Sequence, residues 1–260
     1  MIRRLGAPAR AFGEALRFLT AMPVPGAERW LGPPSLDGLG RSLPAFTAVG
    51  WALGGLSAGL ALALWHGVGP TFAAVGVLAL WAAATLGLHL DGVADSADAL
   101  FSGRPRARKL EILKDSRIGA MGAIALVLVM LGQWSGLAAL GPKVWMGALL
   151  APVFGRLANL WGLVHFPVLE GSSLGRALKD RATPRVLAIA AAIALVPALI
   201  VFGPHVLWIL ALAWFAAHAF AAAANRSLGG LSGDLLGAMT EIAQLATLVG
   251  LAAAVHHGLV

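Results

Sequence analysis

Long runs without a charged residue are the feature that most constrains how this chain can fold. Residues 42–90, 118–142, 144–155, 157–169, 186–225 and 242–260 contain no Asp, Glu, Lys or Arg. A helix needs about 20 apolar residues to cross the hydrocarbon core of a bilayer. Only 12% of the residues are charged, against roughly 25% in soluble domains. We therefore expect an all-α, polytopic membrane helical bundle.

The runs divide into about seven transmembrane helices within a single integral membrane domain, residues 1–260. Residues 1–43 form a cytoplasmic or interfacial lead-in, and residues 91–117 form a cytoplasmic loop rich in acidic and basic residues. The expected spans are residues 44–66, 70–90, 118–140, 145–164, 186–202, 206–224 and 236–256. The weakest is 186–202, because it is short and contains Pro197.

The basic residues predict the orientation, since Lys and Arg in short loops stay on the cytoplasmic side. Of the 19 Lys and Arg residues, all but Lys143 fall on one side of the seven-span arrangement. We count Arg156 there because it lies near an expected helix end. The N-terminus is then cytoplasmic, the C-terminus is outside, and the 12 acidic residues lie on the cytoplasmic side or at its boundary. The net charge of +7 belongs to membrane loops, so we expect no nucleic-acid partner.

The segment HLDGVADSADALF, residues 89–101, carries an acidic stripe. Asp91, Asp95 and Asp98 are spaced i, i+4 and i+7, which places them on one face of a helix. Like charges on one face repel, and the end of the preceding span would add the negative pole of its dipole. A divalent cation such as magnesium, shared with substrate phosphates, would offset these charges. A solvated acidic helix end is the alternative.

A second acidic pair lies in GGLSGDLLGAMTEIAQL, residues 229–245. Asp234 and Glu241 are seven residues apart on one helical face, with Gly237 between them leaving room for a metal or phosphate. Glu241 could instead be a buried residue paired with an arginine. The chain has no Cys, so oxygen or histidine must hold any metal. The seven histidines form no metal set, and His89 is more simply a core residue.

Basic residues lie between the two acidic segments in RKLEILKDSRIGAMG, residues 108–122. Arg117 precedes a run of small residues that begins a span, where a guanidinium can bind phosphate through two parallel hydrogen bonds. Positive-inside anchoring explains the basic residues equally well, although it leaves the interleaved acids Glu111 and Asp115 unexplained.

These segments together resemble the adenosylcobinamide-GDP ribazoletransferase, or cobalamin synthase, family. The opening motif FLTAMPVP (18–25), HLDGVADSADALFS (89–102), LEILKDSRIGAMG (110–122) and GGLSGDLLGAMTEI (229–242) occur in the family's order. Three positions depart from the family pattern: Ala21, Ala99 and Gln244, the last where a second glutamate is common. The resemblance implies a magnesium-dependent membrane enzyme that joins adenosylcobinamide-GDP to alpha-ribazole, or its 5'-phosphate, and releases GMP.

On this resemblance we assign candidate roles to the polar residues. One carboxylate acts as general base, with Asp98 and Asp115 left as alternatives. The predicted metal ligands for Mg²⁺ are Asp91, Asp95, Asp98, Asp234 and Glu241, and the predicted substrate-binding residues are Lys114, Arg117, Arg156 and Arg226. The partners are the two substrates and the lipid bilayer, in a bacterial inner membrane with the site facing the cytoplasm. Homo-oligomerisation stays open.

Two other functions compete with this reading. A CDP-alcohol phosphotransferase also uses an aspartate-rich helix, but it needs an alanine-arginine pair where this chain has Ala94 followed by Asp95. An ion-coupled transporter would place acidic residues near the bilayer midplane, whereas we expect the acids here at one interface. Release of GMP by the purified protein would separate these functions.

Overall fold

The computed structural model describes residues 6–24, 26–170 and 173–260, and this part of the chain is almost entirely helical. Its only β-type pairing is an isolated bridge between Val168 and Leu231. The α-helices are α1 (Ala7–Leu19), α2 (Ala27–Trp30), α3 (Leu36–Ser42), α4 (Phe46–Val68), α5 (Pro70–Thr85), α6 (Leu88–Leu100), α7 (Arg106–Ile112), α8 (Ala120–Ala139), α9 (Val144–His165), α10 (Ser173–Arg181), α11 (Pro184–Phe202), α12 (Val206–Leu228) and α13 (Gly233–His256). Short 3₁₀ turns at Leu43–Ala45 and Gly141–Lys143 lead into α4 and α9.

Six helical segments of the described chain are long and apolar enough to cross a membrane, and α5 with α6 makes a seventh if the bent pair counts as one span. This confirms the expected all-α membrane bundle. The weakest expected span is also confirmed, because α11 has a mean hydropathy of 2.5 in its most apolar window. Pro197 lies inside α11 without ending it.

The expectation of one continuous helix over 70–90 is wrong. α5 ends at Thr85, and the axes of α5 and α6 meet at 89°. The break lies at Leu86 and Gly87, which adopt the left-handed conformation with φ of 51° and 71°. Asp91 therefore lies in the first turn of α6, so the helix dipole favours its negative charge instead of opposing it. The loop expected over 91–117 is likewise partly helical, since it contains most of α6 and all of α7.

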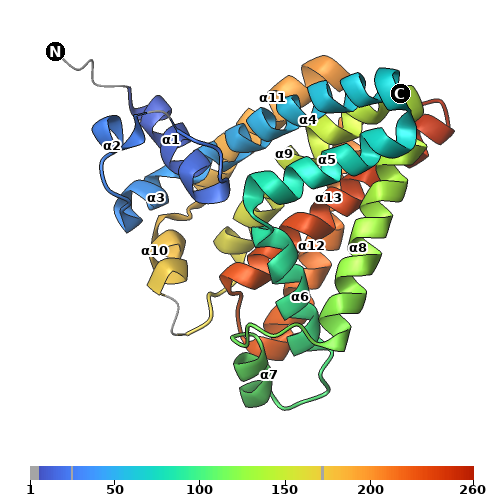
Figure 1. Cartoon of the computed structure of the whole chain (residues 1–260). Coiled ribbons are helices and arrows are strands. Elements are labelled where there is room, and N and C mark those ends of the chain that lie inside the picture. Colours follow the sequence, from blue (N-terminus) through green and yellow to red (C-terminus); the bar gives the residue numbers. More distant parts are fainter. Residues whose placement is uncertain (1–5, 25, 171–172) are drawn as a thin grey trace.

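Helices α9 and α13 form the centre of the bundle (Figure 1). Their apolar windows are 78% and 67% buried, against 17% to 44% for the other spanning segments. The remaining spanning helices pack around this pair and carry most of the exposed large apolar residues. Polar side chains on α9 and α13 must therefore find partners within the protein.

The two ends of the bundle differ in character. At one end, Lys143 donates a hydrogen bond through Nζ to the carbonyl of Val260 at 2.6 Å, so the C-terminus lies beside the turn that precedes α9 (Figure 1). α7 and the segment joining α6 to α8 lie at the opposite end. The assignment of that second end to the cytoplasm stays a prediction from the basic residues.

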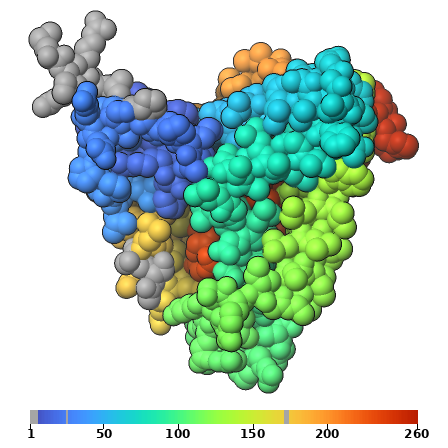
Figure 2. Space-filling model, viewed as in Figure 1, coloured from blue at the N-terminus to red at the C-terminus, as the bar shows by residue number. Residues whose placement is uncertain are grey.

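Helices α1 to α3 form a small lobe beside the bundle (Figure 2). Gly13 of α1 lies directly under the ring of Trp30, and Glu14 pairs with Arg17 at 2.6 Å. An ion pair between Asp37 and Arg181 joins α3 to α10. Ala15 and Leu19 of α1 are buried in the apolar core, so this helix packs one side on the rest of the protein.

Candidate functional site

The three aspartates of the acidic stripe lie on α6 with the expected spacing, but their surroundings differ. Asp91 is exposed, whereas Asp95 and Asp98 are half-buried. Coulombic repulsion acts on Asp95 from Asp91, Asp98 and two carboxylates outside α6, Asp234 and Asp115. The sequence reasoning therefore identified a real concentration of negative charge, to which α13 and the α7–α8 segment also contribute.

Asp98 is bound to the start of α8. One carboxylate oxygen accepts a hydrogen bond from the backbone N–H of Gly119 at 2.6 Å, and the other accepts one from Gly122 at 2.8 Å. Helix N-termini leave such donors unpaired and attract negative charge. A Cβ atom at Gly119 or Gly122 would approach the Asp98 carboxylate to 2.5 or 2.4 Å. The glycines of the RIGAMG motif thus make room for this carboxylate, and Asp98 joins α6 to α8.

Asp91 and Asp95 have free carboxylate oxygens. Within the described residues, neither accepts a hydrogen bond or forms an ion pair. Asp234, in the first turn of α13, accepts one hydrogen bond from the Ser232 hydroxyl at 3.2 Å. These three aspartates, which we call the open carboxylate cluster, are the acidic residues best placed to receive a ligand. The described residues contain no group of three acidic or histidine side chains already close enough to hold a metal ion.

Close contact between α6 and α13 brings the two acidic segments together. A Cβ atom at Gly92 would lie 2.3 Å from the backbone oxygen of Asp234, so only glycine permits this approach. Gly237 makes a similar contact, because a Cβ atom there would lie 3.3 Å from the Cα of His89. Gly237 also lines a cavity of about 260 Å³ together with Asp234, so the suggestion that it leaves room for a metal or phosphate stays a prediction.

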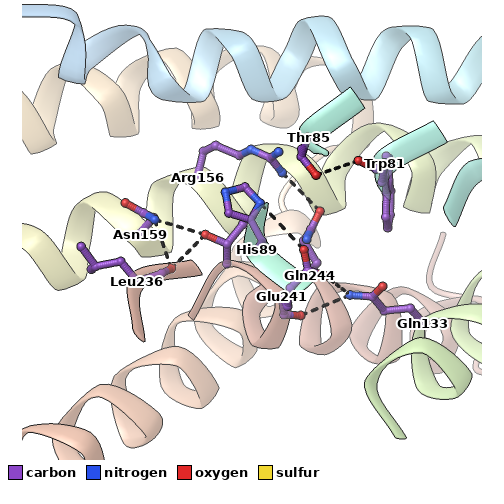
Figure 3. A network of polar contacts seen from close by, with 10 residues as sticks. Trp81, Thr85, His89, Gln133, Arg156, Asn159, Leu236, Glu241 and Gln244 are labelled. Carbon is purple, nitrogen blue, oxygen red and sulfur yellow. Dashed lines mark hydrogen bonds and ion pairs between the residues drawn. The ribbon is translucent and has the colours of Figure 1, made fainter. Parts of the chain in front are cut away.

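Glu241 lies apart from the open carboxylate cluster, in a polar network buried between α6, α8, α9 and α13 (Figure 3). Its Oε2 accepts a hydrogen bond from Gln133 at 2.7 Å, and its Oε1 is 3.8 Å from Nδ1 of His89. Glu241 is only 7% exposed. Glu241 and Asp234 lie on the same face of α13, but the two carboxylates belong to different surroundings.

Arg156 belongs to the same buried network. The expectation that it lies near a helix end is wrong, because it is inside α9 and only 2% exposed. It donates a hydrogen bond through Nη1 to Oε1 of Gln244 at 3.3 Å and is attracted by the charge of Glu241. Its Nε and Nη2 have no hydrogen-bond partner among the described residues. A cavity of about 20 Å³ next to them is large enough for one water molecule.

We call Arg156, Glu241, His89, Gln133 and Gln244 the buried network. Glu241 is buried, as the alternative interpretation expected, but its contacts are with Gln133 and His89 instead of a paired arginine. His89 is buried too, which agrees with its interpretation as a core residue. Glu241 is buried inside the bundle, and its expected place at the cytoplasmic boundary of the membrane stays a prediction. We did not predict a role for Gln133 from the sequence. Its polar amide within an otherwise apolar run was the feature that could have pointed to it.

The predicted substrate-binding cations at the α7 end are exposed. Lys114 and Arg226 have no hydrogen bond or ion pair within the described residues. Arg117 is held by Asp115, to which it donates from Nε at 2.9 Å and from Nη2 at 2.6 Å. Hydrogen bonds from the Arg117 side chain, and then from its backbone, hold the pKa of Asp115 at about 2. Such a carboxylate is a weak base, so Asp115 serves here as a partner for Arg117.

Comparisons with known proteins agree with these motifs. The family model for cobalamin-5-phosphate synthase matches residues 11–252. An adenosylcobinamide-GDP ribazoletransferase of Roseiflexus sp. (strain RS-1) is 41% identical over 94% of this chain and 90% of its own length. The enzyme of the same name from Herpetosiphon aurantiacus is 42% identical over 94% and 96%, and that from Stutzerimonas stutzeri is 40% identical over 92% and 96%.

No solved structure matches the chain. The family model covers most of the sequence, and the relatives align along nearly their whole lengths. All four motifs that suggested the resemblance fall mainly or wholly within the matched residues. The chain therefore belongs to the cobalamin-5-phosphate synthase family of multi-pass membrane proteins.

Proposed function

We propose that this protein transfers alpha-ribazole, or its 5'-phosphate, to adenosylcobinamide-GDP and releases GMP. A ribose hydroxyl attacks the phosphorus on the cobinamide side of the pyrophosphate. The new oxygen–phosphorus bond forms as the bond to GMP breaks, and the hydroxyl proton passes to a base. The observation that carries the proposal is the close contact of α6 with α13 at Gly92 and Asp234, which brings Asp234 within electrostatic reach of Asp91 and Asp95.

The open carboxylate cluster fits the donor chemistry of Mg²⁺. The ion prefers oxygen ligands and is usually held by one or two carboxylates together with water and substrate phosphates. Asp91 and Asp95 offer free oxygens beside Asp234, and their mutual repulsion would be relieved by a cation. Mg²⁺ bound there would neutralise charge on the pyrophosphate. Asp98 and Glu241 were also predicted as ligands, but their oxygens already accept hydrogen bonds.

The chain's own residues then have separate roles. Lys114 and Arg226 are exposed and have no partner in the described part of the chain, so they can bind phosphate oxygens. Arg117 would first have to share its guanidinium with Asp115. Asp98 fixes α6 to α8, and Arg156 stays inside the buried network. Among the carboxylates, Asp95 and Asp234 are better placed than Asp98 or Asp115 to accept the hydroxyl proton, because they are not engaged by several donors. We place the reaction on the cytoplasmic side of the inner membrane, as the basic loops predict.

A comparison of two Asp→Asn variants tests this function. Purified protein is supplied with adenosylcobinamide-GDP, alpha-ribazole and Mg²⁺, and released GMP is measured. The parent and Asp180→Asn, a change at an exposed position of α10, should release GMP at similar rates. Asp95→Asn should lower turnover by about 100-fold or more, as loss of an electrostatic group at a reacting centre does. Equal rates in Asp95→Asn and the parent would contradict the assignment of the cluster, and no GMP from the parent would contradict the function.

A further inference from the structure

A cavity of about 260 Å³ lies beside the open carboxylate cluster. Residues from α1, α4, α6, α9, α10 and the first turns of α13 line it. Figure 2 shows the orange-red surface around the start of α13 recessed between α6, the N-terminal lobe and α10. We call this cavity the α10 pocket.

The α10 pocket is apolar along most of its wall and polar on one side. Phe18 and Phe46 contribute aromatic rings whose centroids are 6.1 Å apart. The polar side is formed by His89, Asn159 and Asp234, together with Ser232. Among the described lining residues there is no Lys or Arg. Such a lining suits a flat apolar ring with a hydroxylated end and disfavours a phosphate.

We propose that the α10 pocket binds the aromatic base of the acceptor nucleoside and directs its ribose toward Asp234. This inference rests on the proposed function, since it names where one of the two substrates sits. Aromatic side chains favour an aromatic ligand through offset or edge contacts. Asp234 is the charged residue of the lining, and its backbone touches α6 at Gly92. A ribose held there lies beside the open carboxylate cluster.

The size of the pocket indicates which of the two substrates it can hold. Its volume of about 260 Å³ is just below the roughly 300–1,000 Å³ of pockets for drug-sized ligands, which suits a bicyclic base and excludes a corrin macrocycle. A wider, more open groove of about 720 Å³ includes Asp91, Arg17 and Leu86. This groove leaves space for the larger substrate on the other side of the cluster.

Helix α10 forms the outer wall of the pocket, and one of its side chains fixes it to α9. Leu174 and Leu178 of α10 face the cavity. Lys179 donates hydrogen bonds through Nζ to the carbonyl oxygens of Leu163, Val164 and Phe166, at 2.8, 2.8 and 2.9 Å. These carbonyls lie at the C-terminal end of α9, where a cation is favoured. The wall is therefore held by hydrogen bonds within the protein itself.

Direct binding of labelled alpha-ribazole to purified protein by equilibrium dialysis tests the inference without turnover. Leu174→Trp adds bulk to the pocket wall, and Leu207→Trp makes the same change at an exposed position of α12. We expect Leu174→Trp to weaken alpha-ribazole binding by about tenfold or more, the scale of a steric change in an apolar pocket. Leu207→Trp should bind like the parent. Equal affinities in all three proteins would overturn the inference and favour a lipid chain as occupant.

A variant that gains binding of a new ligand tests the pocket in a way that misfolding cannot explain. Leu174→Ala enlarges the same wall, so it should bind a riboside whose base carries one additional fused ring, which the parent should exclude. Failure of Leu174→Ala to bind the larger riboside better than the parent does would also overturn the inference.

Kinetics keep this inference separate from the proposed function. In Leu174→Trp, the KM for alpha-ribazole should rise by about tenfold while the KM for adenosylcobinamide-GDP stays within about twofold. A parent that binds alpha-ribazole but releases no GMP would contradict the proposed function and leave the pocket assignment intact. A rise in the KM for adenosylcobinamide-GDP alone would contradict the pocket assignment while the function stands.

Discussion

Two groups of charged residues share helices α6 and α13, yet their environments are opposite. The open carboxylate cluster holds Asp91, Asp95 and Asp234, which repel one another and make few hydrogen bonds. The buried network contains both signs of charge, and an amide side chain is hydrogen-bonded to each: Gln133 to Glu241 and Gln244 to Arg156. One group has partners of opposite charge within the protein, whereas the other has no ion pair among the described residues.

The difference shows how a membrane enzyme can carry like charges at a site without losing its fold. Asp91 and His89 are only two residues apart on α6, and Asp234 and Glu241 are two turns apart on α13. The buried network fixes these helices against α8 and α9, while the small residues Gly92 and Gly237 let them touch. The helices are therefore held by groups other than the open carboxylate cluster.

The largest effect on stability should come from Arg156→Met, which leaves Glu241 buried with less compensation. Removing one partner of a buried charge pair costs about 3–5 kcal/mol. We expect a large fall in the thermal unfolding temperature in detergent. The double variant Arg156→Met/Glu241→Gln should recover part of the loss, because no uncompensated charge remains. If the stability losses of the two single variants simply add in the double variant, the two residues do not act as one network.

Gly92→Ala should impair both regions, because it separates the helices that they share. The added Cβ would meet the backbone oxygen of Asp234 at 2.3 Å, and such overpacking costs about 1–3 kcal/mol. A displacement of about 1 Å at a reacting centre can lower turnover by about 100-fold. Gly55→Ala is the matched control, since a Cβ there meets nothing within 4 Å. Unchanged turnover in Gly92→Ala would show that this contact does not position the site.

The Asp→Asn variants of α6 should divide into two classes. Asp98→Asn weakens the bonds to the start of α8 and should cost about 1 kcal/mol, the usual value of a helix cap. Asp91→Asn and Asp95→Asn should be no less stable than the parent without metal, because they relieve repulsion. Added Mg²⁺ should then raise the unfolding temperature of the parent more than that of these two variants. Identical stability changes in all three variants would contradict the distinction between Asp98 as a structural residue and Asp91 and Asp95 as ligand-binding residues.

The sequence was sufficient to predict the membrane bundle, since charge-free runs of span length leave few other folds. It was also sufficient to locate the acidic stripe, because helical spacing decides which side chains share a face. It could not reveal the break at Leu86, a residue type that rarely adopts positive φ. Nor could it separate Glu241 from Asp234, because burial depends on which helices pack against each turn of α13. The role of Asp98 depends on a contact with Gly119 and Gly122, more than 20 residues away.

The smallest effect concerns Asp115, a half-exposed carboxylate whose charge acts on Asp95. Asp115 is already paired with the guanidinium of Arg117. Arg117 lowers its pKa from 3.8 to about 2. A lowered pKa means that the charged pair stabilises the folded state at pH values above about 4 and that this contribution is lost as the pH falls toward 2. The unfolding temperature of the parent should therefore exceed that of Asp115→Asn by a small, constant amount between pH 5 and 8. The difference should shrink below about pH 4. A difference that already disappears between pH 7 and 5 would mean that Asp115 shares the environment of the open carboxylate cluster, and that Arg117 is free to bind phosphate.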